Sequence, residues 1–155
     1  LGALLANLLL ADPGYVALRF AGRLANDPPG RLSLGETVPS PGDVPAGTIV
    51  PPIEAVISVG LSKTGVTIEA GLPLLQQMIH RARKCRLMGS AALDMAYVAC
   101  GRLDAYIEQG VSLWDVAAGW ILIETGGGRV ELKPRTDMKD KFSVVASNGV
   151  IDLKI

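Results

Sequence analysis

Hydrophobic and polar positions change their period in blocks along this chain, and each block has the period of one kind of element. The predicted elements are, in order, a strand over residues 55–59, a helix over 68–84, a strand over 86–88, a helix over 91–100, a strand over 103–108, a helix over 112–125, and strands over 129–132 and 142–146. In the first helix, apolar residues recur at helical spacing at Ile68, Leu72, Leu75, Met78, Ile79 and Ala82. We expect this stripe to face the core.

Start and stop signals support the later elements. Ser90 and Ser112 are favourable N-cap residues for the second and third helices. Gly101 closes the second helix, and three consecutive glycines close the third at residues 126–128. Residues 103–108 alternate with a period of two, which places Tyr106 and Glu108 on one face of the predicted strand.

The order of elements indicates an α/β fold. Strands that alternate with helices through short links form a mostly parallel sheet with helices on both faces. We assign residues 53–155 to this α/β domain. Residues 1–52 read as the remnant of a preceding sheet region followed by a Pro/Gly-rich connector, because five of the ten prolines lie between Gly35 and Pro52.

Composition narrows the class of protein. The 155 residues suffice for one domain, yet 49 % are hydrophobic and only 19 % are charged, so we expect a missing segment or a second subunit to cover an apolar face. Zero net charge gives no electrostatic footprint for nucleic acid. One histidine and two isolated cysteines exclude a structural zinc site and suit a reducing cytoplasm. No apolar run reaches the length needed to span a membrane.

Asp115 is the main candidate for chemistry, and it has two interpretations. Ser112 and Asp115 have the spacing of a capping box, in which an acid in the first turn only stabilises a helix. Alternatively, Asp115 is a ligand for Mg²⁺. Trp114 before it and the small residues 117–119 after it predict rigid packing on both sides, which an octahedral magnesium site needs.

A second group of candidates lies near Asp115 at the carboxyl edge of the predicted sheet, where open α/β sheets place ligands. Glu108 ends a strand there, and its alternative interpretation is a carboxylate paired with Arg86 or Arg102. The segment Gly89, Ser90, Ala91 begins a helix whose backbone N–H groups can face a ligand, whereas Ser90 alone is explained as a cap. We give Asp94 and Asp104 structural roles.

These segments together resemble a known family. Residues 114–119 read W-D-V-A-A-G, Asp115 follows Glu108 by seven residues, and residues 86–94 read R-L-M-G-S-A-A-L-D. This pattern resembles the second signature of the inositol monophosphatase family, whose fold is a layered αβαβα sugar-phosphatase arrangement. The resemblance implies a homodimeric, Mg²⁺-dependent phosphomonoesterase in which a metal-activated water attacks phosphorus. Asp115 is then a metal ligand, and Glu108 and the N–H of Ala91 bind substrate hydroxyls.

The family's first signature, D-P-[IL]-D-G-[ST], is absent from these residues. We therefore expect the chain to be the C-terminal part of an enzyme and to lack the N-terminal half of the active site. Related families that act on fructose 1,6-bisphosphate or 3′-phosphoadenosine 5′-phosphate share the W-D-x-A-A-G motif. Glu108 and the G-S-A-A-L-D block favour inositol monophosphate as substrate, and a non-catalytic interaction module of the same fold is the alternative in another class.

Overall fold

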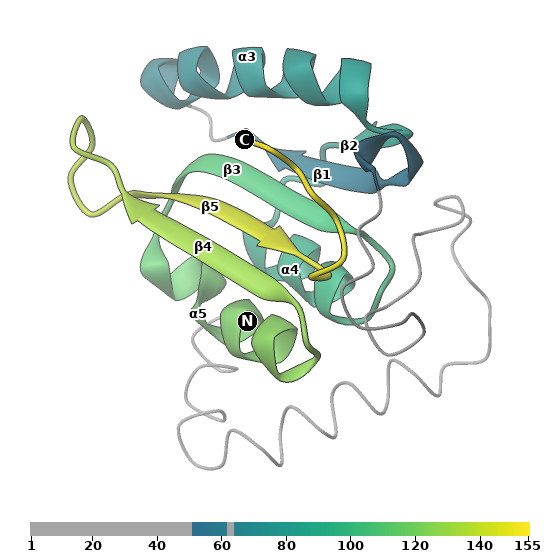
Figure 1. Cartoon of the computed structure of the whole chain (residues 1–155). Coiled ribbons are helices and arrows are strands. Elements are labelled where there is room, and N and C mark those ends of the chain that lie inside the picture. The colour runs from purple at the N-terminus through teal and green to yellow at the C-terminus, as the bar shows by residue number, and fades with distance from the viewer. Residues whose placement is uncertain (1–50, 62–63) are drawn as a thin grey trace.

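The computed structural model describes residues 51–61 and 64–155, which form one mixed sheet between two layers of helices (Figure 1). The elements are η2 (Pro52–Glu54), β1 (Val56–Gly60), α3 (Gly65–Arg81), β2 (Lys84–Arg86), α4 (Ala91–Ala99), β3 (Ala105–Val111), α5 (Leu113–Thr125), β4 (Arg129–Pro134) and β5 (Phe142–Ser147). The predicted α/β class and the order of elements are confirmed. The sheet region and most of the connector predicted within residues 1–52 lie outside the described residues.

The strand order in the sheet is β2-β1-β3-β5-β4. β1 pairs in parallel with both β2 and β3, whereas β5 pairs antiparallel with β3 and with β4. Among the described strands, β5 alone therefore runs against the others, so the sheet is mostly parallel in direction. The reversal has a simple cause: β4 and β5 are joined by a short loop without a helix, and such a link joins antiparallel neighbours.

Each face of the sheet has its own apolar core. α3 covers one face, and α4 and α5 cover the other (Figure 1). The side chains of β3 divide between the two as predicted, with Ala105 and Ile107 towards α3 and Tyr106 towards α4 and α5. Among the described residues, no helix is both long and apolar enough to cross a membrane.

The predicted core stripe is confirmed at Met78 and Ala82, which are buried, and at Leu75, which packs against the core, but it is wrong at three other positions. The residues of α3 that are buried are Thr67, Gly71, Leu74 and Met78, while Ile68, Leu72 and Ile79 are 38 %, 49 % and 57 % exposed. The helix starts at a capping box in which Thr64 and Thr67 bond each other, which turns Thr67 inward. A Cβ at Gly71 would meet the end of the Leu61 side chain, so the helix lies close to the residue that follows β1 at this point. Close packing, rather than hydrophobicity alone, decides which face is buried.

Two buried or partly buried polar groups, on Arg81 and Asp104, join distant segments of the chain. The Arg81 guanidinium donates to the carbonyl oxygens of Leu153, at 2.5 Å, and Lys154, at 3.3 Å. This contact holds the last described segment against the end of α3, where Val150 and Leu153 complete the core.

The buried Asp104 carboxylate accepts from the Val56 N–H at 2.7 Å and from Asn148 Nδ2 at 3.2 Å. The structural role predicted for Asp104 is therefore confirmed.

Helices α4 and α5 pack closely enough that one glycine controls their separation. A Cβ at Gly119 would overlap the Cβ of Met95 in α4. We expect Gly119→Ala to lower the free energy of unfolding by about 1–3 kcal/mol, because a Cβ close to the backbone cannot rotate away. Gly65→Ala is the matched control in α3, since nothing lies within 4 Å of a Cβ there. The control should be neutral or stabilise by about 0.5–1 kcal/mol, and urea unfolding of both variants measures the contrast.

Candidate functional site

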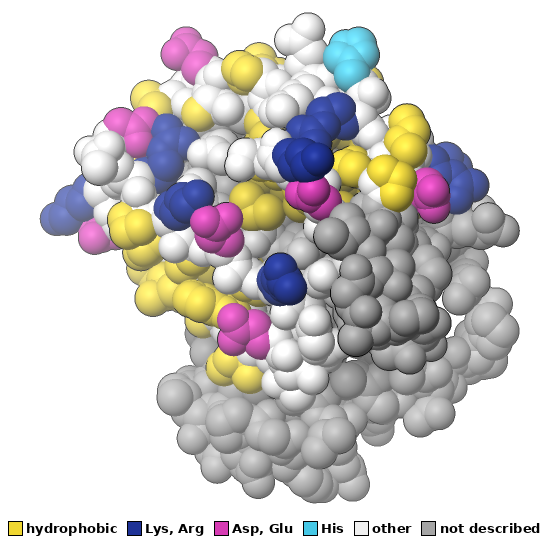
Figure 2. Space-filling model, viewed as in Figure 1, with side chains coloured by type: hydrophobic (Ala, Val, Ile, Leu, Met, Phe, Trp, Pro, Cys, Tyr) yellow, Lys and Arg dark blue, Asp and Glu magenta, His cyan; other side chains and the backbone are white. Residues whose placement is uncertain are grey.

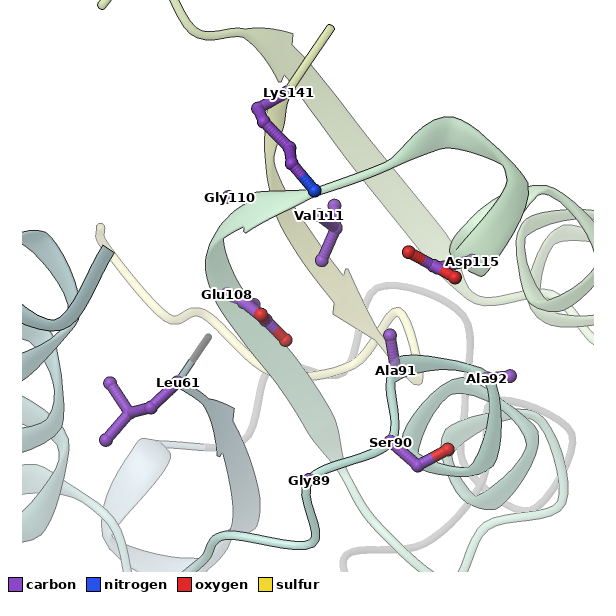
Figure 3. Close-up of a pocket in the computed structure, with 10 residues that line it drawn as sticks. All are labelled: Leu61, Gly89, Ser90, Ala91, Ala92, Glu108, Gly110, Val111, Asp115 and Lys141. Atoms are coloured by element: carbon purple, nitrogen blue, oxygen red, sulfur yellow. The ribbon is translucent and has the colours of Figure 1, made fainter. Parts of the chain in front are cut away.

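A pocket of about 450 Å³ lies at the edge of the sheet where β1 and β3 end and where α4 and α5 begin (Figure 3). Its lining residues are Leu61, Gly89, Ser90, Ala91, Ala92, Glu108, Gly110, Val111, Asp115 and Lys141. All five residues that the sequence predicted for the site are among them. The pocket therefore joins segments that lie far apart in the chain, and this is the position where open α/β sheets bind ligands.

The start of α4 forms one wall of the pocket. Gly89 has a φ of +74°, a conformation that favours glycine, and it turns the chain from β2 into the helix. Ser90 occupies the N-cap position as predicted, but its hydroxyl makes no capping hydrogen bond, so that part of the prediction is wrong. The first N–H groups of a helix have no intrahelical partner, so the turn that begins at Ala91 presents donors at the pocket wall.

Asp115 lies in the first turn of α5 and is exposed to the pocket. The predicted capping box is absent, because neither side chain of the Ser112 and Asp115 pair makes a capping bond. The Ser112 hydroxyl instead accepts a hydrogen bond from Lys141 Nζ at 2.8 Å. The predicted capping bond of Ser112 is therefore missing, whereas Asp115 still lies in the first turn, where an acid stabilises the helix, and its carboxylate faces the cavity (Figure 3).

The packing predicted around Asp115 is only partly right. Trp114 is 66 % exposed and does not wedge the carboxylate in place. The small residues of α5 do allow a close approach, but Gly119 presses on Met95 of α4 rather than on the sheet. The close contact of α4 and α5 lies one turn beyond Asp115, between Gly119 and Met95.

Glu108 is held by a neighbour that the sequence analysis did not single out. The Tyr106 hydroxyl donates a short hydrogen bond to Glu108 Oε2. The predicted alternative, a pair with Arg86 or Arg102, is not supported, because the groups that act on the Glu108 carboxylate are Tyr106, Asp115 and Lys141. Burial raises the pKa of Glu108, the bond from Tyr106 lowers it, Asp115 raises it and Lys141 lowers it.

Two further charged residues belong to the site. Lys141 comes from the end of the β4–β5 loop, and its ammonium group points into the pocket between Glu108 and Asp115 (Figure 3). Asp94, in the first turn of α4, is 1 % exposed, and neither of its carboxylate oxygens has a hydrogen-bond partner. Burial raises the pKa of Asp94 to about 6, with the Ser58 side chain acting against it and Glu108 adding to it. The structural role of Asp94 stays a prediction.

The donor set fits part of a magnesium site. Mg²⁺ binds carboxylate oxygens, and Asp115 offers a carboxylate that is exposed to the pocket. Across residues 51–61 and 64–155, however, no three Asp, Glu, His or Cys side chains are arranged to hold a metal. Asp115 is thus suited to be one ligand of a metal ion.

The fold and the pocket define an α/β domain with a polar pocket at the carboxyl edge of its sheet. Residues 47–153 match the inositol monophosphatase family, and the chain belongs to this family. Over 78 residues it is 49 % identical to an inositol-1-monophosphatase of Mesorhizobium japonicum, which covers 50 % of this chain and 29 % of that protein. Over 97 residues it is 36 % identical to a fructose-1,6-bisphosphatase/inositol-1-monophosphatase of Thermotoga maritima, covering 59 % of the chain and 36 % of the relative.

A solved structure agrees with these relatives. The inositol monophosphatase from Anabaena (Nostoc) superposes with a TM-score of 0.56 at 33 % identity, over 66 % of this chain and 43 % of that one. The chain therefore spans about a third of the length of the relatives that it matches. The phosphatase family assignment and the partial sugar-phosphatase-like fold predicted from the sequence are both confirmed.

Asp94 generates a prediction about pH. Its pKa is raised in the folded state, so the free energy of unfolding contains a contribution that is complete below pH 3.8 and is lost as the pH rises through about 6. Asp94→Asn cannot titrate. We expect the stability of the wild type relative to this variant to fall by up to about 3 kcal/mol between pH 4 and pH 8, at 1.36 kcal/mol for each pKa unit.

Urea unfolding of the full-length protein at several pH values measures this difference. Asp152→Asn is the control, since the Asp152 side chain is 41 % exposed and pairs only with Lys154 at the surface. A difference between wild type and Asp94→Asn that stays constant with pH would show that Asp94 keeps an ordinary pKa.

Proposed function

We propose that the full-length protein hydrolyses a phosphate monoester with Mg²⁺, and that its substrate is an inositol monophosphate. One observation carries the proposal: in a chain of this family, Glu108, the start of α4 and Asp115 line the same pocket. A hydroxyl acceptor, backbone N–H donors and a carboxylate that can bind a hard cation are then within reach of one small molecule.

Each group has a distinct task in this proposal. Glu108 accepts hydrogen bonds from substrate hydroxyls, and such bonds to a charged acceptor are stronger than neutral ones. The backbone at Gly89, Ser90 and Ala91 donates to a substrate oxygen. Asp115 serves as one ligand of Mg²⁺, which when bound supplies positive charge for the leaving oxygen and activates a water molecule. Lys141 adds a positive charge that attracts the phosphate ester.

The choice of substrate rests on Glu108. A ring that presents several hydroxyl groups gains most from an acceptor that is already oriented towards the pocket. Fructose 1,6-bisphosphate remains an alternative, supported by the name of the Thermotoga relative, and 3′-phosphoadenosine 5′-phosphate is another. If the protein were instead a non-catalytic interaction module, Mg²⁺ would neither stabilise it nor give it activity.

Asp115→Asn tests the proposal most directly. Asn caps helices about as well as Asp, and the structure contains no capping bond to lose, so the variant should melt at nearly the wild-type temperature without metal. Its neutral oxygen is a poorer magnesium ligand, so we expect at least about a hundredfold loss of turnover of inositol 1-phosphate. The rise in melting temperature that Mg²⁺ gives the wild type should also disappear.

The measurement is phosphate release from the full-length protein with Mg²⁺ and with excess chelator, beside thermal melting. Asp137→Asn is a matched control, because Asp137 lies in the β4–β5 loop, pairs with Arg135 and does not line the pocket. An Asp115→Asn variant that keeps full activity and its magnesium stabilisation would contradict the ligand role. Wild-type activity that persists in chelator would contradict the magnesium dependence.

We further propose that the protein is a cytoplasmic homodimer and that α3 contributes to the contact. Hydrophobic side chains reach the surface over α3 (Figure 2). They include Ile68, Leu72 and Ile79, which repeat at helical spacing along one flank of the helix, next to its buried face. An apolar stripe of this kind is typical of a surface that is covered in the assembled protein.

Leu72→Glu should weaken this dimer at least about a hundredfold, because a charge would be buried without a partner. Sedimentation of the full-length protein over a range of concentrations measures the effect. Gln77→Glu is the control on the opposite flank of the same helix, where the polar side chain is already exposed. A wild type that sediments as a monomer, or a Leu72→Glu variant that stays dimeric, would contradict the proposal.

A further inference from the structure

The contact between Tyr106 and Glu108 is more than a neighbouring pair on a strand. Both residues lie on β3 and project from the same face, because they are two positions apart. Tyr106 is fully buried beneath the pocket, and its hydroxyl donates to Glu108 Oε2. Among the described residues, Glu108 has no other hydrogen bond or ion pair, and its carboxylate points into the cavity (Figure 3).

A second constraint acts on Glu108 from β1. The register of the two parallel strands places Gly60 opposite Glu108. A Cβ at Gly60 would overlap the Glu108 carboxylate, so this group lies directly against the strand backbone. The Tyr106 phenol and the Gly60 backbone therefore together limit the position and the direction of the Glu108 carboxylate.

The phenol also controls the charge of Glu108. Burial, followed by the nearby carboxylates, raises the pKa of Tyr106 far above its ordinary value, so the hydroxyl keeps its proton and remains a donor. The titratable groups that face Glu108 are the neutral phenol of Tyr106 on β3, Asp94 on α4, Asp115 on α5 and Lys141 after the β4–β5 loop. Burial and Asp115 raise the pKa of Glu108, and the bond from Tyr106 opposes them.

We propose that Tyr106 is a positioning residue, which holds the Glu108 carboxylate in place to accept a hydroxyl group of the substrate. This inference rests on the proposed function, because it assumes that Glu108 binds hydroxyls. A glutamate that is free to rotate loses up to about 2 kcal/mol of side-chain entropy when it binds, and a carboxylate already fixed by a phenol loses less. Tyr106 thus sets the preference for hydroxylated alcohols without touching the substrate.

Tyr106→Phe in the full-length protein tests this role, since it removes the donor and keeps the buried ring. For inositol 1-phosphate we expect KM to rise about tenfold or more, as for the loss of a hydrogen bond to a charged group, while kcat changes less than about threefold. For phenyl phosphate, whose alcohol carries no further hydroxyl, both constants should stay near wild type. The acid limb of kcat/KM for inositol 1-phosphate should move to higher pH, because Glu108 loses the bond that lowers its pKa.

Two further variants separate positioning from folding. In a Glu108→Gln background, Tyr106→Phe should add little to the loss, since the two residues act as one unit. Tyr97→Phe is the matched control, because Tyr97 lies in α4, away from the pocket lining, and contacts Arg102 through its ring. It should leave all kinetic constants unchanged.

Equal losses on both substrates without a shift in the pH profile would overturn the proposal and leave Tyr106 as a core residue. If the wild type hydrolyses neither ester, the proposed function fails, and the contact is then tested without catalysis. NMR titration of ¹³C-labelled glutamate should show a higher pKa for Glu108 in Tyr106→Phe than in the wild type. No change in that pKa would overturn the positioning role by itself.

Discussion

The parallel pairing of β1 with β3 is the constraint on which the rest of this structure depends. Asp104 fixes the register, because its backbone N–H donates to the Val56 carbonyl at 2.9 Å while its carboxylate accepts from the Val56 N–H. With this register, both strands end at one edge and Gly60 lies opposite Glu108. A slip of one residue in β3 would turn Tyr106 and Glu108 to the α3 face and remove the floor of the pocket.

Much of the fold was predictable because local signals agree with the global arrangement. Period, N-cap positions and glycine stops gave the order of helices and strands, and the alternation in β3 gave the face of each residue. The packing of α3 was not predictable in the same way. The helix buries Thr67 and Gly71 and exposes Ile68 and Leu72, because its rotation depends on the Thr64 and Thr67 capping box and on packing against Leu61, which appear only in three dimensions.

The candidate site was also predictable only in part. The five predicted residues that line the pocket could be found from the sequence, since each lies within a local motif at a strand end or a helix start. The side chains that contact these residues could not be found in this way. Lys141 lies 29 positions from Ser112 in the chain and donates to the hydroxyl that the capping box would have used. The capping rule therefore predicted the N-cap residue correctly but not its hydrogen bond. The phenol of Tyr106 was assigned to the right face, but its contact with Glu108 depends on the depth of the pocket floor.

The contribution of the last residues to the α3-side core has a consequence for synthesis on the ribosome. That core joins Ile57 and Val59 near the start of the described region to Val150 and Leu153 near its end. Translation at about 5–20 residues per second separates these ends by roughly 5–20 seconds. Throughout this interval the apolar face of β1 lacks part of its core, so this part of the nascent chain is open to aggregation or chaperone capture until Val150 and Leu153 have emerged.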